Sequence, residues 1–348
     1  MFRKKKILAT DITELLNHLA ILLESGISSS EALHILQQDE EKPALQQLMQ
    51  HIKKDLDAGS HLADSLAKHP RYFEDFIVDL VRGGELRDQL VAVLNDVVRY
   101  RESIEAIELT VNIRNSFIYP AALLAIGLVI LSFLLHYVIP VFRDMFSSFG
   151  GDLPALTQFL VQLSDFFVAN WIIVLAIILI LGFYVQREYR KQSWVGAWME
   201  LYVPVFGRLF RYIIIIRCLR TVVLMLSHKA TIAQAITIAA KTVNNPIYNQ
   251  ALYLVSQQVA DGITLAEALL SSKIFPRKMV QAAVVGSKTE RLSELFSKLA
   301  DIYTKQVQQA AKPAIQVLEL FLIVLLGIMI GVLVIGLYLP IFKMGEAI

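Results

Sequence analysis

The chain has 348 residues, of which 55% are hydrophobic and 18% are charged, and its mean hydropathy is +0.54. Soluble domains average roughly 45–50% apolar and about 25% charged residues, so this composition argues against an ordinary soluble enzyme. The net charge of +2 provides no basic field for nucleic acid, and one cysteine, Cys218, excludes an intrachain disulfide framework. We therefore expect an integral membrane protein with no nucleic-acid partner.

The amino-terminal segment predicts a cytoplasmic start. Lys4, Lys5 and Lys6 are followed by Asp11 and Glu14 before any apolar stretch long enough for a secretory signal. The apolar residues that follow recur at intervals of three and four, which is the period of an α-helix. We expect residues 1–116 to form a cytoplasmic helical bundle.

Three stretches without formal charge are long enough to cross about 30 Å of hydrocarbon as helices. They cover residues 117–139, 166–185 and 320–342. A fourth apolar run, 212–226, contains Arg217 and Arg220, which are costly to insert into lipid. We expect that run to be a buried helix outside the membrane.

The basic residues near the predicted spans set their orientation, because loops rich in Lys and Arg stay in the cytoplasm. The loop 140–165 carries one basic residue, Arg143, and three aspartates, which places it outside. Residues 186–319 then form a second cytoplasmic bundle, and the tail 343–348 is external. The predicted fold is all-α, with two bundles and three transmembrane helices.

The two bundles carry matching helix-start motifs. Ser28 with Glu31 and Thr231 with Gln234 both fit a capping box, and they lie 203 positions apart (231 − 28). Similar shifts relate further residues, which predicts an internal repeat of one helical unit. These pairs are Gly59 and Gly262, Gly84 and Gly286, and Pro140 and Pro340.

Several glycines and prolines have simple structural interpretations. The glycines at the repeat positions, together with Gly26, are expected in turns. Pro140 and Pro340 are expected to end helices, with partner contact as the alternative. Gly327 and Gly331 form a GxxxG pattern, which indicates either a helix interface or a chance match.

The sequence predicts neither an enzyme nor a cofactor-binding protein. It lacks a phosphate-binding glycine loop, a GxSxG nucleophile turn and an HExxH pair. We expect a buried, inert thiol at Cys218 rather than a thiol with a lowered pKa, and solvated positions for the six cytoplasmic histidines. His136, within the first span, either has a function or extends to the interface. An oligomeric small-solute permease or channel stays open as the alternative function, although the spans contain no Asp, Glu, Lys or Arg.

Motifs along almost the whole chain are similar to those of one family. The sequence resembles the inner-membrane platform proteins of type IV pilus and type II secretion machines, the GspF/PilC family. The matching motifs are Leu22-Leu23-Glu24-Ser25-Gly26-Ile27, Glu31-Ala32-Leu33, Gly84-Glu85 with Leu90, Tyr119-Pro120, Pro140-Val141-Phe142, Leu153-Pro154, Val317-Leu318-Glu319 and Tyr338-Leu339-Pro340-Ile341-Phe342.

This resemblance implies a location, partners and contact residues. It implies a bacterial inner-membrane protein, at least dimeric, that couples a cytoplasmic hexameric assembly or retraction ATPase to the transmembrane helices of pilins or pseudopilins. Other inner-membrane machine components would be partners as well. It implies no cofactor, and metal binding by the cytoplasmic domains is left open. The expected family-motif and partner-contact residues are Gly26, Glu31, Gly84, Glu85, Tyr119, Pro120, Pro140, Gly286, Glu319 and Pro340.

Overall fold

A computed structural model describes residues 7–110, 118–133, 137, 140–141, 158–159, 162 and 206–346. No strand occurs among these residues, which confirms the all-α prediction for this part of the chain. The chain divides into two compact units, Met1–Val111 with Gly207–Gln308, and Asn112–Phe206 with Gln309–Ile348. The predicted span 166–185 and His136 lie outside the described residues.

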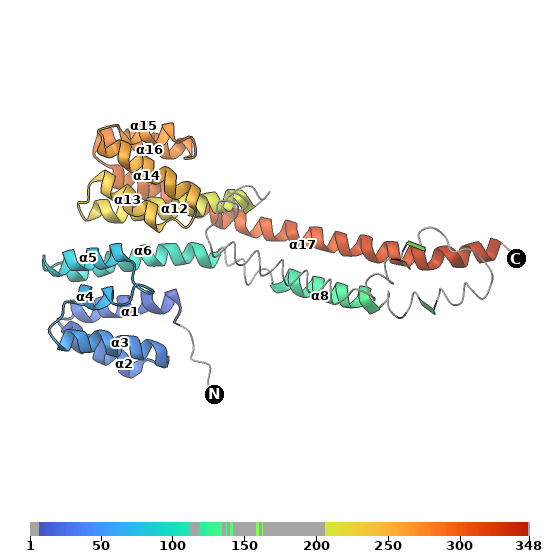
Figure 1. The fold of residues 1–348 in the computed structure, drawn as a ribbon, viewed down its shortest axis with the longest axis horizontal. Helices are drawn as coiled ribbons and strands as arrows, with labels where there is room; N and C mark the ends of the chain where they lie inside the picture. The colour runs from blue at the N-terminus through green and yellow to red at the C-terminus, as the bar shows by residue number, and fades with distance from the viewer. Residues whose placement is uncertain are drawn as a thin grey trace. The chain divides into compact units, whose positions relative to one another are not determined.

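Six helices form what we call the first bundle (Figure 1). Among them α1 packs against α6, α2 against α3, and α4 against α5. Their apolar faces enclose one core, which includes Ile12, Leu16, Leu33, Met49 and Ile77. In chain order the helices are α1 (Ala9–Glu24), α2 (Ser29–Asp39), α3 (Pro43–Asp57), α4 (Leu62–Ala67), α5 (Asp75–Glu85) and α6 (Leu90–Thr110).

The second bundle lies in the same unit and has a similar series of helices. α13 and α14 begin 203 positions after α2 and α3 (232 − 29 and 246 − 43) and have the same lengths of 11 and 15 residues. The run 212–226 lies within α12, with Ile215, Ile216 and Leu219 fully buried, which confirms its prediction as a buried helix. The helices are α12 (Phe206–Ser227), α13 (Ile232–Thr242), α14 (Pro246–Ala260), α15 (Leu265–Ser271), α16 (Arg277–Thr289) and the first part of α17 (Leu292–Glu346).

Side-chain capping starts several of these helices. Thr231 Oγ1 accepts from the Gln234 amide at 3.3 Å, and Gln234 Oε1 accepts from the Thr231 amide at 3.1 Å, so this predicted capping box is confirmed. In the first bundle, Ser28 Oγ accepts from the Glu31 amide at 3.3 Å, which is one half of the predicted box.

The glycines divide into two kinds. Gly26, Gly59 and Gly262 have positive φ and lie in turns, as predicted. The turn prediction was wrong for Gly84 and Gly286, which are buried inside α5 and α16. A Cβ atom at Gly84 would lie 2.9 Å from Val93 Cγ2, and one at Gly286 would lie 2.8 Å from Leu292 Cα. Glycine at these positions therefore allows the following helix to pack closely.

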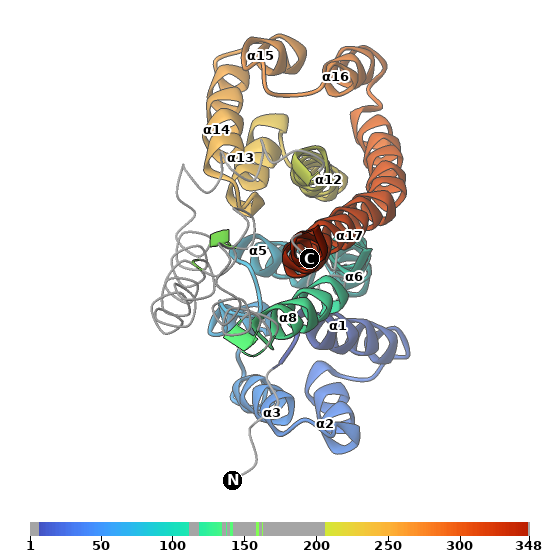
Figure 2. The same cartoon turned by 90° about the vertical axis from the view of Figure 1, so that its right-hand side faces the viewer.

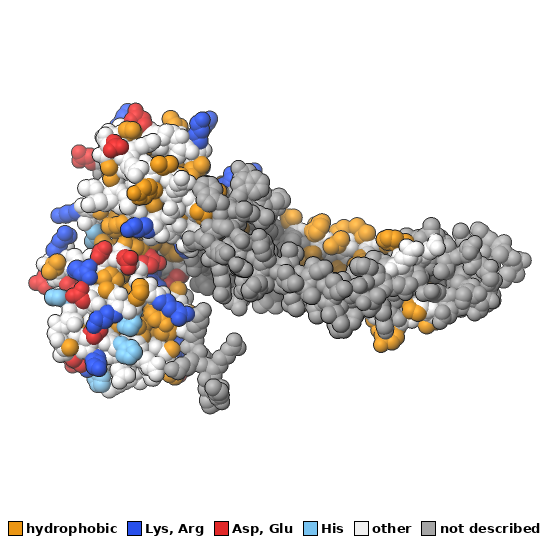
Figure 3. Space-filling view, in the orientation of Figure 1, with side chains coloured by type: hydrophobic (Ala, Val, Ile, Leu, Met, Phe, Trp, Pro, Cys, Tyr) orange, Lys and Arg blue, Asp and Glu red, His pale blue; other side chains and the backbone are white. Residues whose placement is uncertain are grey.

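The second unit contains α8 (Ile118–Phe133) and the rest of α17. Within the described residues, one helical segment, Glu319–Gly336, is long and apolar enough to cross a membrane, with a mean hydropathy of 2.8. Leu320, Phe321 and Ile328 in this segment are exposed, and hydrophobic side chains gather along the described part of α17 (Figure 3). This pattern suits a helix that faces lipid. A Cβ atom at Gly327 or Gly331 would contact nothing described within 4 Å.

The prediction that Pro340 ends a helix was wrong, because α17 continues to Glu346. A proline inside a helix removes one backbone hydrogen bond, which membrane helices tolerate when neighbouring groups satisfy the carbonyl that is left. Pro140 also has helical geometry and is exposed.

Candidate interaction sites

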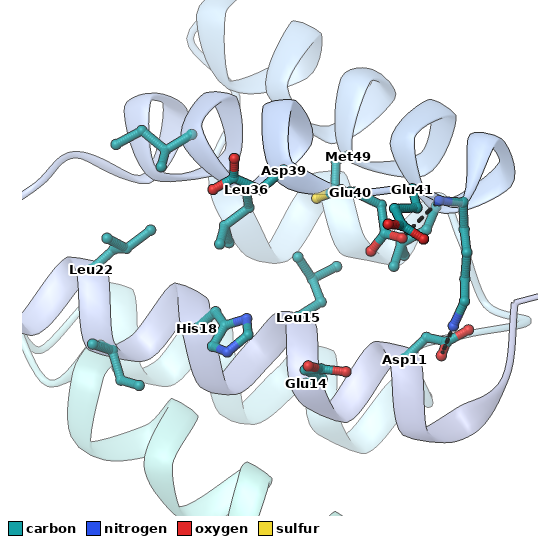
Figure 4. A pocket seen from close by; sticks show the side chains of 14 residues that line it. Asp11, Glu14, Leu15, His18, Leu22, Leu36, Asp39, Glu40, Glu41 and Met49 are labelled. Carbon is teal, nitrogen blue, oxygen red and sulfur yellow. Dashed lines mark hydrogen bonds and ion pairs between the residues drawn. The ribbon is translucent and has the colours of Figure 1, made fainter.

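The first candidate site is an open groove of about 630 Å³ between α1, α2 and α3, which we call the acidic groove. Figure 2 shows α2 and α3 next to each other, with α1 between this pair and α6. The groove has an apolar floor of Leu15, Leu45 and Met49, all buried. Acidic side chains from α1, from the end of α2 and from the α2–α3 turn surround this floor (Figure 4). The lining residues are Asp11, Glu14, Leu15, His18, Ile21, Leu22, Ile35, Leu36, Asp39, Glu40, Glu41, Lys42, Leu45 and Met49.

One ion pair closes an end of the acidic groove. Lys42 Nζ lies 2.6 Å from Asp11 Oδ1, and Asp11 Oδ2 accepts from the Leu8 amide at 2.9 Å. Asp11 is only 6% exposed. Its hydrogen bond to Lys42 raises the pKa of that ammonium group. Asp11 therefore holds the start of α1 against the α2–α3 turn, which leaves other carboxylates to face the groove.

Of the four other carboxylates in the lining, Glu40 is half-buried and accepts from the Lys42 amide at 2.8 Å, whereas Glu14, Asp39 and Glu41 are exposed. None of the three forms an ion pair with another described residue. The groove thus combines buried apolar side chains with carboxylates that face solvent. Such a surface suits a partner with both apolar and basic side chains.

A second open groove brings together two motifs that are far apart in the sequence. It has a volume of about 730 Å³ and includes Leu23 and Glu24 from the end of α1 together with Glu85, Asp88 and Leu90 from the α5–α6 turn. The predicted motifs around Gly26 and around Gly84 therefore meet at one surface. We call this surface the Glu85 groove.

Glu85 caps the start of α4. Its Oε1 accepts from the Leu62 amide at 2.7 Å, and its Oε2 accepts from the Ala63 amide at 3.0 Å. The N-cap residue itself, His61, makes no capping bond through its side chain. A carboxylate at this position satisfies two free amides and interacts favourably with the helix dipole. Glu85 thus has a structural role that its motif alone did not reveal.

In the second bundle, α15 begins with a different kind of cap. Thr264, which lies 203 positions after His61, accepts from the Glu267 amide at 3.3 Å and caps α15 itself. Ser287 lies 202 positions after Glu85 (287 − 85), the same spacing that separates Gly84 from Gly286. The capping oxygen therefore comes from a distant glutamate in one bundle and from the adjacent threonine in the other. The sequence does contain one indication that α4 is capped from elsewhere, because His61 at its N-cap is not one of the residue types that usually cap a helix.

Among the predicted site residues, only Gly84 and Glu85 have a clear tertiary role in the first bundle. Glu31 is exposed in the first turn of α2, and Gly26 follows α1. Gly286 packs in the second bundle. The remaining predicted residues lie in the second unit and include helical positions of α8 and α17; they are Tyr119, Pro120, Pro140, Glu319 and Pro340.

The two bundles meet through a small polar and apolar interface. The hydroxyl of Tyr100 on α6 lies 3.2 Å from Thr221 Oγ1 on α12, which lies 3.1 Å from Thr242 Oγ1 on α13. Leu224, Met225 and Ile238 of the second bundle pack against the core of the first bundle. Burial at this interface raises the pKa of Tyr100 to about 12.

Reactive side chains have modest roles in the described part of the chain. Burial raises the pKa of the Cys218 thiol to about 12, which agrees with an inert thiol and not with an activated one. His18, His34, His51 and His61 are exposed as predicted, whereas His69 and His228 are half-buried. No group of three or more His, Cys, Asp or Glu among the described residues is arranged to hold a metal ion.

These features define a helical protein with a mixed-charge bundle unit and an apolar helix that is suited to a bilayer. The family model for protein F of the type II secretion system matches residues 15–140 and 218–340. The chain therefore belongs to this family, which confirms the resemblance to GspF/PilC proteins.

Relatives of known assignment match nearly the full chain. The chain is 32% identical to the type IV pilus assembly protein PilC of Myxococcus xanthus, over 97% of this chain and 81% of the relative. It is 29% identical to the type IV pilus assembly protein TapC of Aeromonas hydrophila, over 99% of this chain and 83% of the relative. It is 26% identical to type II secretion system protein F of Vibrio cholerae, over 99% of this chain and 84% of the relative.

Proposed function

We propose that this chain is an inner-membrane platform protein of a type IV pilus or type II secretion machine. In this role it couples a cytoplasmic assembly ATPase to the insertion of pilin or pseudopilin subunits into a growing fibre. The observation that carries the proposal is the match of one family model to residues 15–140 and 218–340, together with relatives named for both machines.

The proposed organisation has two cytoplasmic copies of one helical unit and three membrane spans. The starts of the two matched ranges differ by 203 (218 − 15), which is the shift between α2 and α13 (232 − 29). Gly84 and Gly286 support the duplication, because each allows close packing at the same step of its unit. The amino terminus would be cytoplasmic and the carboxyl terminus external.

In this proposal the chain carries force without catalysing a reaction. The ATPase would act on the cytoplasmic bundles, whose surfaces offer charged docking sites such as the two grooves. The exposed apolar side chains of α17, including Phe321, Ile328 and Tyr338, would contact the hydrophobic helix of a pilin. Between membrane helices such contacts depend on van der Waals packing, since lipid is as apolar as the partner.

Two experiments test the proposal. In the first, the gene is deleted, surface fibres or secreted substrate are measured, and the full-length chain is supplied again. Fibre assembly or secretion should be lost and then restored. Unchanged assembly and secretion, together with failure of the purified chain to bind the assembly ATPase and a pilin helix, would refute the coupling role.

The second experiment tests the topology. Single cysteines are introduced at exposed positions of the two bundles, for example Gln50 and Glu290, in a Cys218→Ser background. A membrane-impermeant thiol reagent should label neither position from outside intact cells and both after lysis. Labelling of one bundle from outside would contradict two cytoplasmic copies.

A further inference from the structure

The second bundle uses one particular face to contact the first bundle. Leu224 and Met225 of α12 and Ile238 of α13 pack against the core of the first bundle. Thr221 and Thr242 lie beside them. Thr221 Oγ1 is within hydrogen-bonding distance of both the Tyr100 hydroxyl and Thr242 Oγ1. This face of α12 and α13 is therefore covered by the first bundle, with α6 opposite it.

The corresponding face of the first bundle is open. A shift of 203 positions, as in the duplication proposed above, relates the five residues of the covered face to His18, Ile21, Leu22, Ile35 and Asp39. All five line the acidic groove. Leu224 is 5% exposed in the covered face, whereas its counterpart Ile21 is 51% exposed. A surface that holds a helix in one copy thus lies uncovered in the other.

The two faces differ sharply in charge. Glu14, Asp39 and Glu41 of the acidic groove correspond to Arg217, Thr242 and Asn244 in the second bundle. On the covered face, Asp96 Oδ2 of α6 lies 3.2 Å from His228 Nε2, and Glu105 of α6 lines a small cavity with Arg217, together with Arg101 of α6 itself. An occupant of the acidic groove should carry the opposite charge at these points.

We propose that the acidic groove is the docking site for a basic amphipathic helix of a partner protein. The partner's apolar residues would cover Ile21 and Leu22, as the first bundle covers the matching Leu224 and Met225 of α12. Its lysines or arginines would face Glu14, Asp39 and Glu41. This inference rests on the proposed duplication and names the chemistry of one partner of the proposed platform.

A second copy of the chain is a less suitable occupant. The helix that corresponds to α6 in the second bundle is the start of α17, where Tyr303 takes the place of Tyr100. Tyr303 is only 2% exposed and stacks on Tyr212 with ring centroids 5.1 Å apart. That helical face is therefore already covered within the same bundle.

The test uses two fluorescent peptides with the sequence of α6, residues 90–110. One keeps the natural sequence, and the other, the basic probe, carries Asp96→Lys and Glu105→Lys. Binding to the full-length protein in lipid nanodiscs is followed by fluorescence anisotropy. The basic probe should bind about tenfold more tightly than the natural peptide, and added salt should weaken its binding.

Protein variants locate the binding site. The triple variant Glu14→Lys, Asp39→Lys and Glu41→Lys should lose affinity for the basic probe by about tenfold or more. A matched variant with three exposed acids reversed elsewhere in the first bundle, Asp75→Lys, Asp79→Lys and Glu102→Lys, should bind nearly as the natural protein does. Circular dichroism verifies that both variants fold.

Three outcomes would overturn the proposal. The first is that the natural peptide and the basic probe bind equally tightly, or that both triple variants lose the same affinity for the basic probe. The second is that the basic probe binds only after residues 1–6 have been deleted. In that case the groove is occupied by the chain's own basic segment, which contains Arg3 and three lysines. The third is a dimer that dissociates in the groove variant, which identifies a second copy. None of these measurements involves fibre assembly. A negative result would therefore refute the docking site without refuting the platform role, which is tested separately by gene deletion.

Discussion

Replacing Gly84 with alanine should destabilise the first bundle, whereas the same change at the adjacent Gly83 should stabilise it. Both glycines lie in the last turn of α5, where alanine gains up to about 1 kcal/mol over glycine. A Cβ atom at Gly83 meets nothing within 4 Å, but one at Gly84 would lie 2.9 Å from Val93 Cγ2 and 3.3 Å from Leu90 Cα. Val93 is buried and β-branched, so it has little room to move.

The difference between the two variants isolates the cost of overpacking, because the gain in helix propensity is common to both. That cost is about 1–3 kcal/mol. For a unit of this size, each kcal/mol shifts the melting temperature by about 2–4 °C. The assay is thermal unfolding of the full chain in detergent, followed by circular dichroism. Equal melting temperatures for Gly83→Ala and Gly84→Ala would refute the close-packing explanation, and Gly286→Ala, with a backbone atom at 2.8 Å, provides a second test.

Four further predictions concern single side chains. Cys218 should react with a thiol reagent at neutral pH only after unfolding, because burial raises its pKa to about 12; rapid modification of the folded chain would contradict this. Glu85→Ala should lower stability by about 1–3 kcal/mol and speed amide exchange at the start of α4, since two buried amides lose their acceptor. Thr264→Ala should lower stability by about 1 kcal/mol and speed amide exchange only at the start of α15. The same pattern of amide exchange in Glu85→Ala and Thr264→Ala would argue against separate caps. The pKa of Tyr100 is raised from 10.0 to about 12, so its contribution to stability is complete below pH 10 and is lost as the pH rises towards 12. Tyr100→Phe should reduce this alkaline loss in denaturant titrations, and an unchanged pH profile would count against it.

Local patterns in the sequence predicted much of the bundle architecture. Ser28 and Thr231 were recognisable as helix caps, because the bond to the amide three residues later depends only on nearby atoms. Arg217 and Arg220 were sufficient to keep α12 out of the predicted membrane spans. These features involve short separations along the chain, which single-sequence reasoning handles well.

Features that depend on tertiary contacts were predicted less well. Gly84 and Gly286 were assigned to turns, because the close approach of the following helix is not visible in the sequence. The role of Glu85 depends on α4, whose first residues precede it by more than twenty positions. The acidic groove was not predicted either, since Asp11, Asp39 and Glu41 come together only when α1 packs beside the α2–α3 turn.

The two caps differ in when they become available during synthesis. The oxygen that caps α15 belongs to Thr264, three residues before the amide from which it accepts a hydrogen bond, so this cap is available as soon as the residues of α15 have been synthesised. The start of α4 has to wait for a carboxylate 23 residues further along the nascent chain. If these short helices were exchanged between the bundles, α15 with Thr264 would bring its cap with it, whereas α4 would leave its cap, Glu85, behind.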